Sequence, residues 1–73
     1  MYTWDVDNEM QKLGQNLKRV RSKKGISQGD IARTLKVHKS YISNLENGKS
    51  NPTLKTIAKL AKAVSVTTDE LLR

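Results

Sequence analysis

The stretch SQGDIARTLKVHKSYISNLENGKSNP, residues 27–52, decides the fold of this 73-residue chain. Its first part predicts a short helix over residues 27–35, with Ser27 as the N-cap and Asp30 at the third helical position. After a two-residue break, a second short helix is predicted over residues 38–47 and is stopped by the glycine that follows. The stretch is therefore predicted to form two short helices joined by a tight turn.

Apolar residues recur at helical spacing on both sides of this stretch. They predict a helix over residues 9–24, a helix over residues 53–64 and a last helical turn over residues 67–72. Thr53 and Thr67 are the expected N-caps of the latter two. The inward face of the helix over residues 9–24 is expected to comprise Met10, Leu13, Leu17 and Val20. That of the helix over residues 53–64 is expected to comprise Leu54, Ile57, Ala58, Ala61 and Val64.

No segment alternates apolar and polar residues over the length of a strand, and no internal repeat is present. The chain is therefore predicted to be all-α, with five short helices. We expect one domain over residues 9–73, preceded by an N-terminal arm over residues 1–8, for which disorder is one alternative. No apolar run approaches the length of a membrane span, so no membrane association is expected.

The composition favours a polyanionic partner and excludes several kinds of site. Fourteen Lys and Arg against seven Asp and Glu give a net charge of +7, which favours nucleic acid, acidic protein or anionic lipid. The chain has no cysteine and one histidine, which excludes disulfides, thiolate metal sites and histidine-clustered zinc. No metal and no cofactor are expected, and the lack of cysteine weakly favours a cytoplasmic setting.

The helix over residues 38–47 has a polar face without a carboxylate. Residues three and four apart share a helix face, and this one gathers Lys39, Ser40, Ser43, Asn44 and Asn47. The major groove of DNA admits one helix whose side chains donate and accept hydrogen bonds. Lys39 suits guanine, Asn44 suits adenine, and the two serines adapt to either role. These four residues are the predicted base contacts.

The two short helices make a helix-turn-helix, and the sequence around them resembles the lambda-repressor and Cro family, the XRE-like regulators. The motifs that carry the resemblance are SQGDIARTLKVHKSYISNLENGKSNP, LGQNLKRVRSKKGIS before it and PTLKTIAKLAKAVSVTTDELL after it. The resemblance implies a lambda-repressor-like helix-turn-helix fold and base contacts from Lys39, Ser40 and Asn44, with Ser43 added from helix geometry. It also implies a phosphate contact from Gln28.

The remaining site residues follow from position and from the resemblance. Asn47 and Lys49 are the next expected phosphate contacts, while Tyr41 fits either a phosphate contact or half-buried packing. In the resembled family an arginine late in the first helix pairs with the glutamate of the recognition helix, which implies a structural ion pair between Arg21 and Glu46. Two positions depart from the family pattern. Lys36 stands where the family usually has a glycine, and His38 stands where it usually has a Ser or Thr cap.

We therefore expect sequence-specific binding of double-stranded DNA by a bacterial or phage transcriptional regulator of repressor type. A single reading helix binds weakly, so a homodimer on a palindromic operator is expected, with Val66, Leu71 and Leu72 as either dimer surface or monomer core. Such a protein would be cytoplasmic, and nucleoid-associated when DNA-bound.

The alternative function is an antitoxin or coactivator-type adaptor that acts through a protein partner. In this case Tyr2 and Trp4 of the N-terminal arm are the candidate anchors, although the tryptophan fits packing against the domain as well. An enzyme is not expected, because the sequence offers no set of nucleophile, base or metal ligands.

Overall fold

The computed structural model describes residues 6–73 and contains five α-helices in that range. Their bounds are α1, Val6–Lys23; α2, Gln28–Leu35; α3, Lys39–Glu46; α4, Leu54–Ala63; and α5, Thr68–Leu72. No strand occurs among the described residues, so the all-α, five-helix prediction is confirmed. Tyr2 and Trp4, the candidate anchors, lie outside the described residues.

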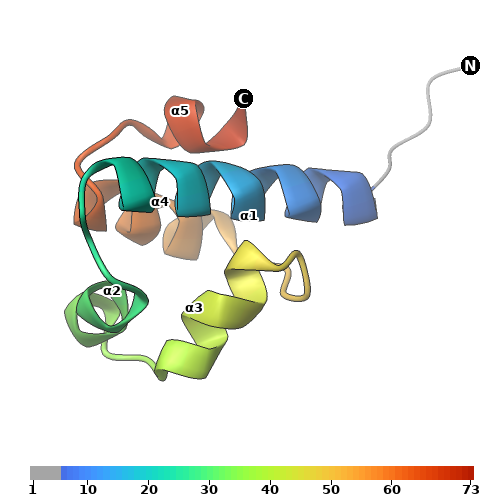
Figure 1. Ribbon diagram of the computed structural model, residues 1–73. Helices are drawn as coiled ribbons and strands as arrows, with labels where there is room; N and C mark the ends of the chain where they lie inside the picture. The colour runs from blue at the N-terminus through green and yellow to red at the C-terminus, as the bar shows by residue number, and fades with distance from the viewer. Residues whose placement is uncertain (1–5) are drawn as a thin grey trace, which may run out of the picture.

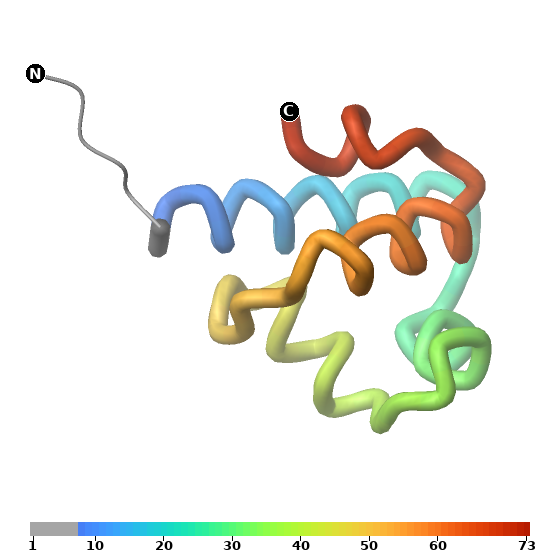
Figure 2. Tube along the Cα trace, turned by 180° about the vertical axis from the view of Figure 1, so that it is seen from behind, coloured from blue at the N-terminus to red at the C-terminus, as the bar shows by residue number. Residues whose placement is uncertain are grey.

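The long helix α1 is the scaffold on which the other helices are arranged (Figure 1). Helix α3 packs on one side of α1 and α5 packs on another, while α4 closes the domain against α2 and α5. Seen from behind, α4 lies in front of α1, and the turn between α2 and α3 lies below the end of α4 (Figure 2). This arrangement leaves one long face of α3 without a helical neighbour.

One hydrophobic core joins all five helices. Its fully buried large side chains come from every helix: Leu17, Ile31, Ile42, Leu45, Leu60, Val64 and Leu71. Burying each such side chain stabilises the fold by about 1.5–3 kcal/mol. A cysteine-free chain of this length relies on this core because it has no covalent cross-link.

Glycine permits the closest approach between α1 and α3. A Cβ atom added at Gly14, in the middle of α1, would lie 2.3 Å from the carbonyl oxygen of Leu45 and 2.6 Å from that of Glu46. Any larger residue would push the end of α3 away from α1. Gly14 therefore helps to set the distance between α1 and the end of α3.

The local signals of the sequence placed the helix ends well. The Ser27 side chain accepts a hydrogen bond from the Asp30 N–H, and the Asp30 carboxylate accepts one from the Ser27 N–H. The Thr53 and Thr67 side chains cap α4 and α5 by accepting hydrogen bonds from the Thr56 and Glu70 N–H groups, and Gly25 ends α1 with a φ of +70°. Helix α1 itself begins at Val6, three residues earlier than predicted.

The predicted inward face of α4 was wrong in two positions. Leu54 is 76% exposed and Ala58 is exposed, whereas Leu60, which was not predicted, is fully buried. Two faces of this helix share Ile57, and both have helical spacing, so periodicity did not distinguish them. Packing against the neighbouring helices selects the face, because α4 contacts α2 and α5 and buries Leu60 in the core that it shares with them.

The C-terminal apolar residues divide between core and surface. Leu71 is completely buried and belongs to the monomer core, and Val66 is half-buried against it. Only Leu72 is substantially exposed, at 45%. The side-chain amide of Asn16 fixes this end by donating hydrogen bonds of 2.9 Å to the carbonyl oxygens of Leu71 and Arg73.

Candidate nucleic-acid interface

Helix α3 has a buried half and an open half. Ile42 and Leu45 are buried almost completely, which holds the helix on the domain. On the other half, Lys39, Ser40 and Asn44 are exposed. Ser43 lies at the border of this face and is half-buried. The structure thus places the four predicted base contacts on or at the edge of one accessible face.

The carboxylate of α3 is turned away from this open face. Glu46 is only 6% exposed and accepts two hydrogen bonds from Arg21, from Nε to Oε2 at 2.6 Å and from Nη2 to Oε1 at 3.1 Å. The hydrogen bond to Glu46 raises the pKa of the Arg21 guanidinium. Arg21 Nη1 also donates to the carbonyl oxygen of Ile26 at 3.0 Å. The ion pair therefore ties α3 to the end of α1.

Gln28 joins this network from the first residue of α2. Its Nε2 donates a hydrogen bond of 2.9 Å to Glu46 Oε1. A phosphate contact was the only role predicted for Gln28, because no local signal in the sequence connects residues 18 apart. An amide nitrogen carries two N–H groups, so the second one remains available at the N-terminus of the helix, where anions are favoured.

The other expected phosphate contacts occupy different environments. Tyr41 is half-buried and packs against the core, so its packing role is present in the structure. Asn47 and Lys49 are exposed just beyond the end of α3. The Lys49 N–H donates to the Asn44 carbonyl oxygen at 2.9 Å and Gly48 has a φ of +72°, which turns the chain sharply there.

The two departures from the family pattern have definite structural outcomes. Lys36 adopts the left-handed conformation, with a φ of 61° and a ψ of 45°, and the next N–H donates back to the Ala32 carbonyl oxygen at 2.9 Å. The turn therefore has the shape that a glycine would take, at a cost of roughly 1 kcal/mol. His38 occupies the N-cap position of α3 but its side chain makes no capping hydrogen bond.

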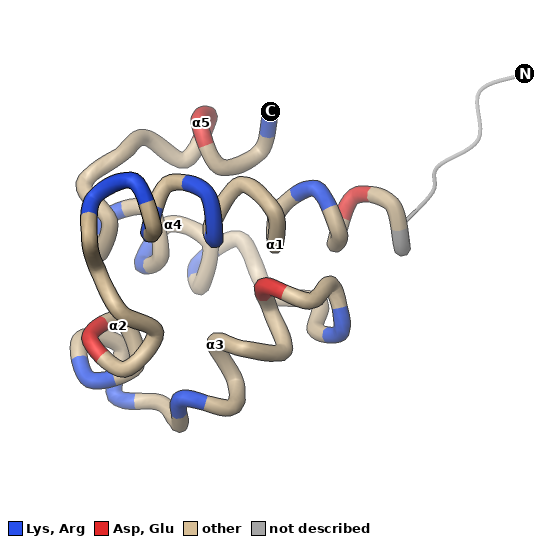
Figure 3. Tube along the Cα trace, viewed as in Figure 1, with Lys and Arg blue, Asp and Glu red and all other residues tan. Residues whose placement is uncertain are grey.

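Cationic residues are spread over all the elements near α3. Figure 3 shows Lys and Arg at the end of α1, on α2, in the turn before α3 and along α4. Among the described residues no group of acidic, histidine or cysteine side chains has the arrangement of a metal site. No helix in residues 6–73 is long and apolar enough to cross a bilayer.

The comparisons with known proteins assign this architecture to a family. The profile of the helix-turn-helix family HTH_3 matches residues 17–71, which include every helix from α2 onward except the last residue of α5. The chain belongs to this family. It is a helix-turn-helix DNA-binding domain.

Similar sequences come from bacterial regulators. The chain is 38% identical over 65 residues to the uncharacterized HTH-type transcriptional regulator y4dJ of Sinorhizobium fredii, covering 88% of this chain and 84% of that protein. It is 36% identical over 61 residues to the HTH-type transcriptional regulator DdrOP3 of Deinococcus deserti, covering 84% of this chain. The chain spans only 47% of the length of DdrOP3.

Solved structures of controller proteins have the same fold. The restriction-modification controller protein C.AhdI from Aeromonas hydrophila superposes with a TM-score of 0.82 at 36% identity, over 88% of this chain and 97% of that one. The controller protein C.Esp1396I, solved as a tetramer in complex with its natural 35 base-pair operator, gives a TM-score of 0.73 at 26% identity, over 88% and 95% of the two chains.

Proposed function

We propose that the chain is a transcriptional regulator of repressor type that binds a specific double-stranded DNA site with α3 in the major groove. One observation carries the proposal: the open face of α3 has only uncharged polar and cationic side chains, while its one carboxylate, Glu46, is buried on Arg21. A carboxylate on the open face would be repelled by the phosphates beside the groove. The family assignment favours this function over the adaptor alternative.

Base recognition is assigned to four residues. Lys39, at the first position of α3, donates to guanine O6 or N7, and Asn44 makes a paired hydrogen bond with adenine N6 and N7. Ser40 and Ser43 donate or accept according to the base that they face. All but Ser43 are exposed in the free protein, so they reach the base edges without repacking.

Phosphate contacts frame this reading face. Gln28 binds a phosphate with its second N–H while the first stays on Glu46, which couples the backbone contact to the position of α3. Asn47 and Lys49 contact the backbone from the C-terminal end of the helix, and the Tyr41 hydroxyl contributes from its first turn. These contacts position the protein and carry no sequence information themselves.

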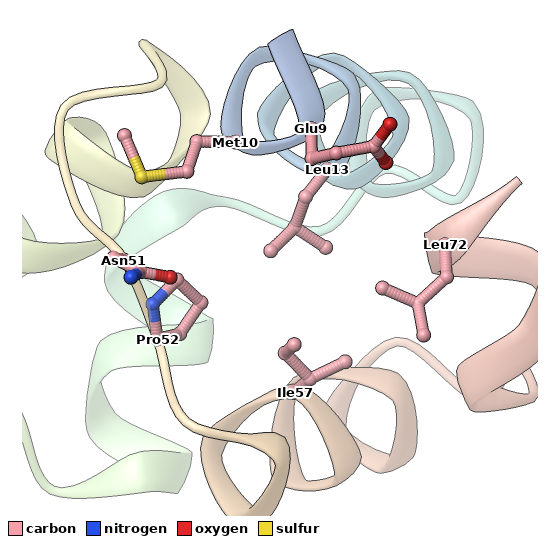
Figure 4. A pocket seen from close by; sticks show the side chains of 7 residues that line it. All are labelled: Glu9, Met10, Leu13, Asn51, Pro52, Ile57 and Leu72. Carbon is pink, nitrogen blue, oxygen red and sulfur yellow. The ribbon is translucent and has the colours of Figure 1, made fainter. Parts of the chain in front are cut away.

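The active form is proposed to be a homodimer on a palindromic operator, with half-sites one turn apart, about 34–36 Å. The proposed dimer surface is the hollow that Figure 4 shows between the first half of α1, the loop before α4, Ile57 and Leu72. Most of the lining is apolar: Met10, Leu13, Pro52, Ile57 and Leu72, with Glu9 and Asn51 at its rim. Such a regulator acts in the bacterial cytoplasm, on the nucleoid when DNA-bound.

Selection from a random duplex library near physiological salt tests the function directly. We expect enrichment of a two-fold symmetric motif, which identifies the operator. Asn44→Ala should relax the preference at one base pair and weaken binding by about 1–3 kcal/mol. The control change Ser22→Ala, at an exposed residue of α1, should leave the motif unaltered. Absence of any enriched motif overturns sequence-specific binding, and an unaltered motif with Asn44→Ala overturns that contact.

Sedimentation of the free protein tests the dimer surface. Leu72→Asp places a charge in the apolar hollow and should shift the monomer–dimer equilibrium toward monomer by at least about tenfold, whereas Leu72→Met should change it little. An equilibrium that is the same in both variants removes this surface from the dimer. The enriched motif would then still report base recognition.

A further inference from the structure

A second groove lies between α2 and α4, beside the turn that leads into α3. It consists of two adjoining hollows that share Leu35, Lys36 and Lys59. One hollow extends toward α3 and the other toward the C-terminal end of α4. The first is lined in addition by Val37, His38, Tyr41 and Thr56, and the second by Thr34, Lys62 and Ala63. We call this feature the α2–α4 groove.

The rim of the α2–α4 groove is strongly cationic. Lys36, Lys59 and Lys62 are all exposed, and no Asp or Glu lines either hollow. Within residues 6–73, none of these three ammonium groups forms an ion pair with a carboxylate. Three uncompensated positive charges around one groove attract a ligand that carries several negative charges.

The floor of the α2–α4 groove is apolar. Leu35 and Ala63 are half-buried, and Val37 is a 36% exposed aliphatic residue in the turn. A phosphate backbone gains nothing from aliphatic carbon, whereas a peptide side chain gains by burying apolar surface. The combination of floor and rim therefore matches an acidic peptide with apolar residues better than it matches nucleic acid.

The second hollow of the groove lies apart from the open face of α3, whereas the first hollow reaches Tyr41, one of the proposed phosphate contacts. Lys62 and Ala63 lie at the C-terminal end of α4, which packs on α2 and α5. The open face of α3 is formed by other residues, none of which lines the second hollow. Figure 2 shows the lower end of α3 well below this end of α4.

We propose that the α2–α4 groove binds an acidic segment of a partner protein while α3 holds DNA. Carboxylates of the segment pair with Lys36, Lys59 and Lys62, and an apolar side chain between them covers Leu35 and Ala63. The left-handed turn presents the Lys36 side chain at the junction of the two hollows. The domain would thereby bring a second protein to the site that it occupies on DNA.

Titration of the full chain with synthetic peptides, followed by methyl NMR at low salt, tests the proposal. The probe is an eight-residue peptide in which leucine alternates with glutamate. We expect saturable shifts of the Leu35, Val37 and Ala63 methyl signals, and the same shifts when the chain is already saturated with duplex DNA. A lysine–leucine peptide should shift none of them, and a glutamate–serine peptide should bind at least about fivefold more weakly.

Charge reversal identifies the groove as the site. The double variant Lys59→Glu, Lys62→Glu should lower the affinity for the glutamate–leucine peptide at least about tenfold, since each exposed ion pair is weak but several are reversed. The matched double variant Lys12→Glu, Arg19→Glu makes the same change in net charge at exposed residues of α1 and should alter that affinity by less than about threefold. Both variants should bind duplex DNA equally well.

Three results would overturn the proposal. The first is the absence of methyl shifts in the groove with the glutamate–leucine peptide. The second is equal binding of the glutamate–serine peptide, which would reduce the groove to a generic cationic surface. The third is a loss of duplex affinity in the α4 double variant that exceeds the loss in the α1 control, which would assign the groove to the DNA backbone. None of these results depends on whether the DNA binding is sequence-specific.

Discussion

Helices α2 and α3 have the same length, eight residues each, but are held in place in opposite ways. Helix α2 has a complete capping box at its start and a left-handed C-cap at Lys36. Helix α3 has no side-chain cap and no charged residue of suitable sign in its terminal turns. Its support comes from distant residues: the core under Ile42 and the ion pair of Glu46 with Arg21. Helix α2 is specified locally, and α3 is specified by the rest of the domain.

The proposed role of α3 in binding DNA explains why it is stabilised by distant residues and α2 by its own caps. A helix that reads DNA must leave one face free of internal partners, so its own polar residues are not available to stabilise it. Isolated helices of this length are marginal in water, and tertiary contacts must supply the missing stability. Substitutions in both helices and in their supports test whether α2 is stabilised locally and α3 by tertiary contacts.

Removing the Glu46 carboxylate should damage α3 more than any other single change to a polar side chain. Glu46→Ala strands the Arg21 guanidinium and removes the acceptor of Gln28, and we expect unfolding to become easier by about 3–5 kcal/mol. Urea denaturation measures the change. Asp69→Ala, which removes the exposed ion pair to Arg73, should cost no more than about 0.5 kcal/mol. A loss for Glu46→Ala as small as this control would contradict the tertiary support of α3.

The two glycines inside helices should respond to alanine with opposite signs. Gly14→Ala places a methyl group against the carbonyl oxygens at the end of α3 and should destabilise the protein by about 1–3 kcal/mol. Gly29→Ala in α2 meets only the Ser27 hydroxyl, at 3.7 Å, and should stabilise it by up to about 1 kcal/mol through helix propensity. Thermal melting of both variants provides the comparison. A stabilised Gly14→Ala would show that α3 is free to move away from α1.

The caps of the two helices offer a matched exchange. Ser27→Ala removes the cap of α2 and should cost about 1 kcal/mol. His38→Ser gives α3 the side-chain cap that it lacks and should add about 0.5–1 kcal/mol. Both changes are measured by chemical denaturation of the free protein. If His38→Ser fails to stabilise, the start of α3 does not have the geometry of an ordinary N-cap.

The smallest expected effect is a pH dependence confined to α2. The hydrogen bond from the Ser27 N–H lowers the pKa of Asp30, followed by the bond with the Ser27 side chain and the charge of Arg33. Because the folded pKa lies below the unfolded one, Asp30 stabilises the protein above the usual aspartate pKa of about 4. This contribution is lost as the pH falls through the lowered value. Asp30→Asn should therefore flatten the acid limb of a stability–pH curve; an identical limb would remove Asp30 from the capping box.

Sequence reasoning succeeded where structure is specified within a few residues. The N-caps of α2, α4 and α5 were each predicted at a Ser or Thr, and all three side chains accept a backbone hydrogen bond there. The turn at Lys36 was placed correctly because the resembled family has a glycine there. These features depend on backbone geometry that the chain expresses locally.

Prediction from the sequence was less successful where contacts between distant helices determine which side chains are buried or bonded. On α4, the sets that include Leu54 or Leu60 both have helical spacing, and only the packing of neighbouring helices selects the second. The bond from Gln28 to Glu46 joins two helices through side-chain positions that no local pattern encodes. The exposure of Leu72 next to the buried Leu71 is decided in the same way.

The division of α3 into a buried half and an open half also makes it a natural cassette for redesign. The side chains that hold it, Ile42, Leu45 and Glu46, are separate from Lys39, Ser40 and Asn44, which are exposed. New residues at the three exposed positions would change no core contact and no ion pair of the described structure. Under the proposed assignment of base contacts, a combinatorial library at these positions would sample altered base preferences at nearly constant stability.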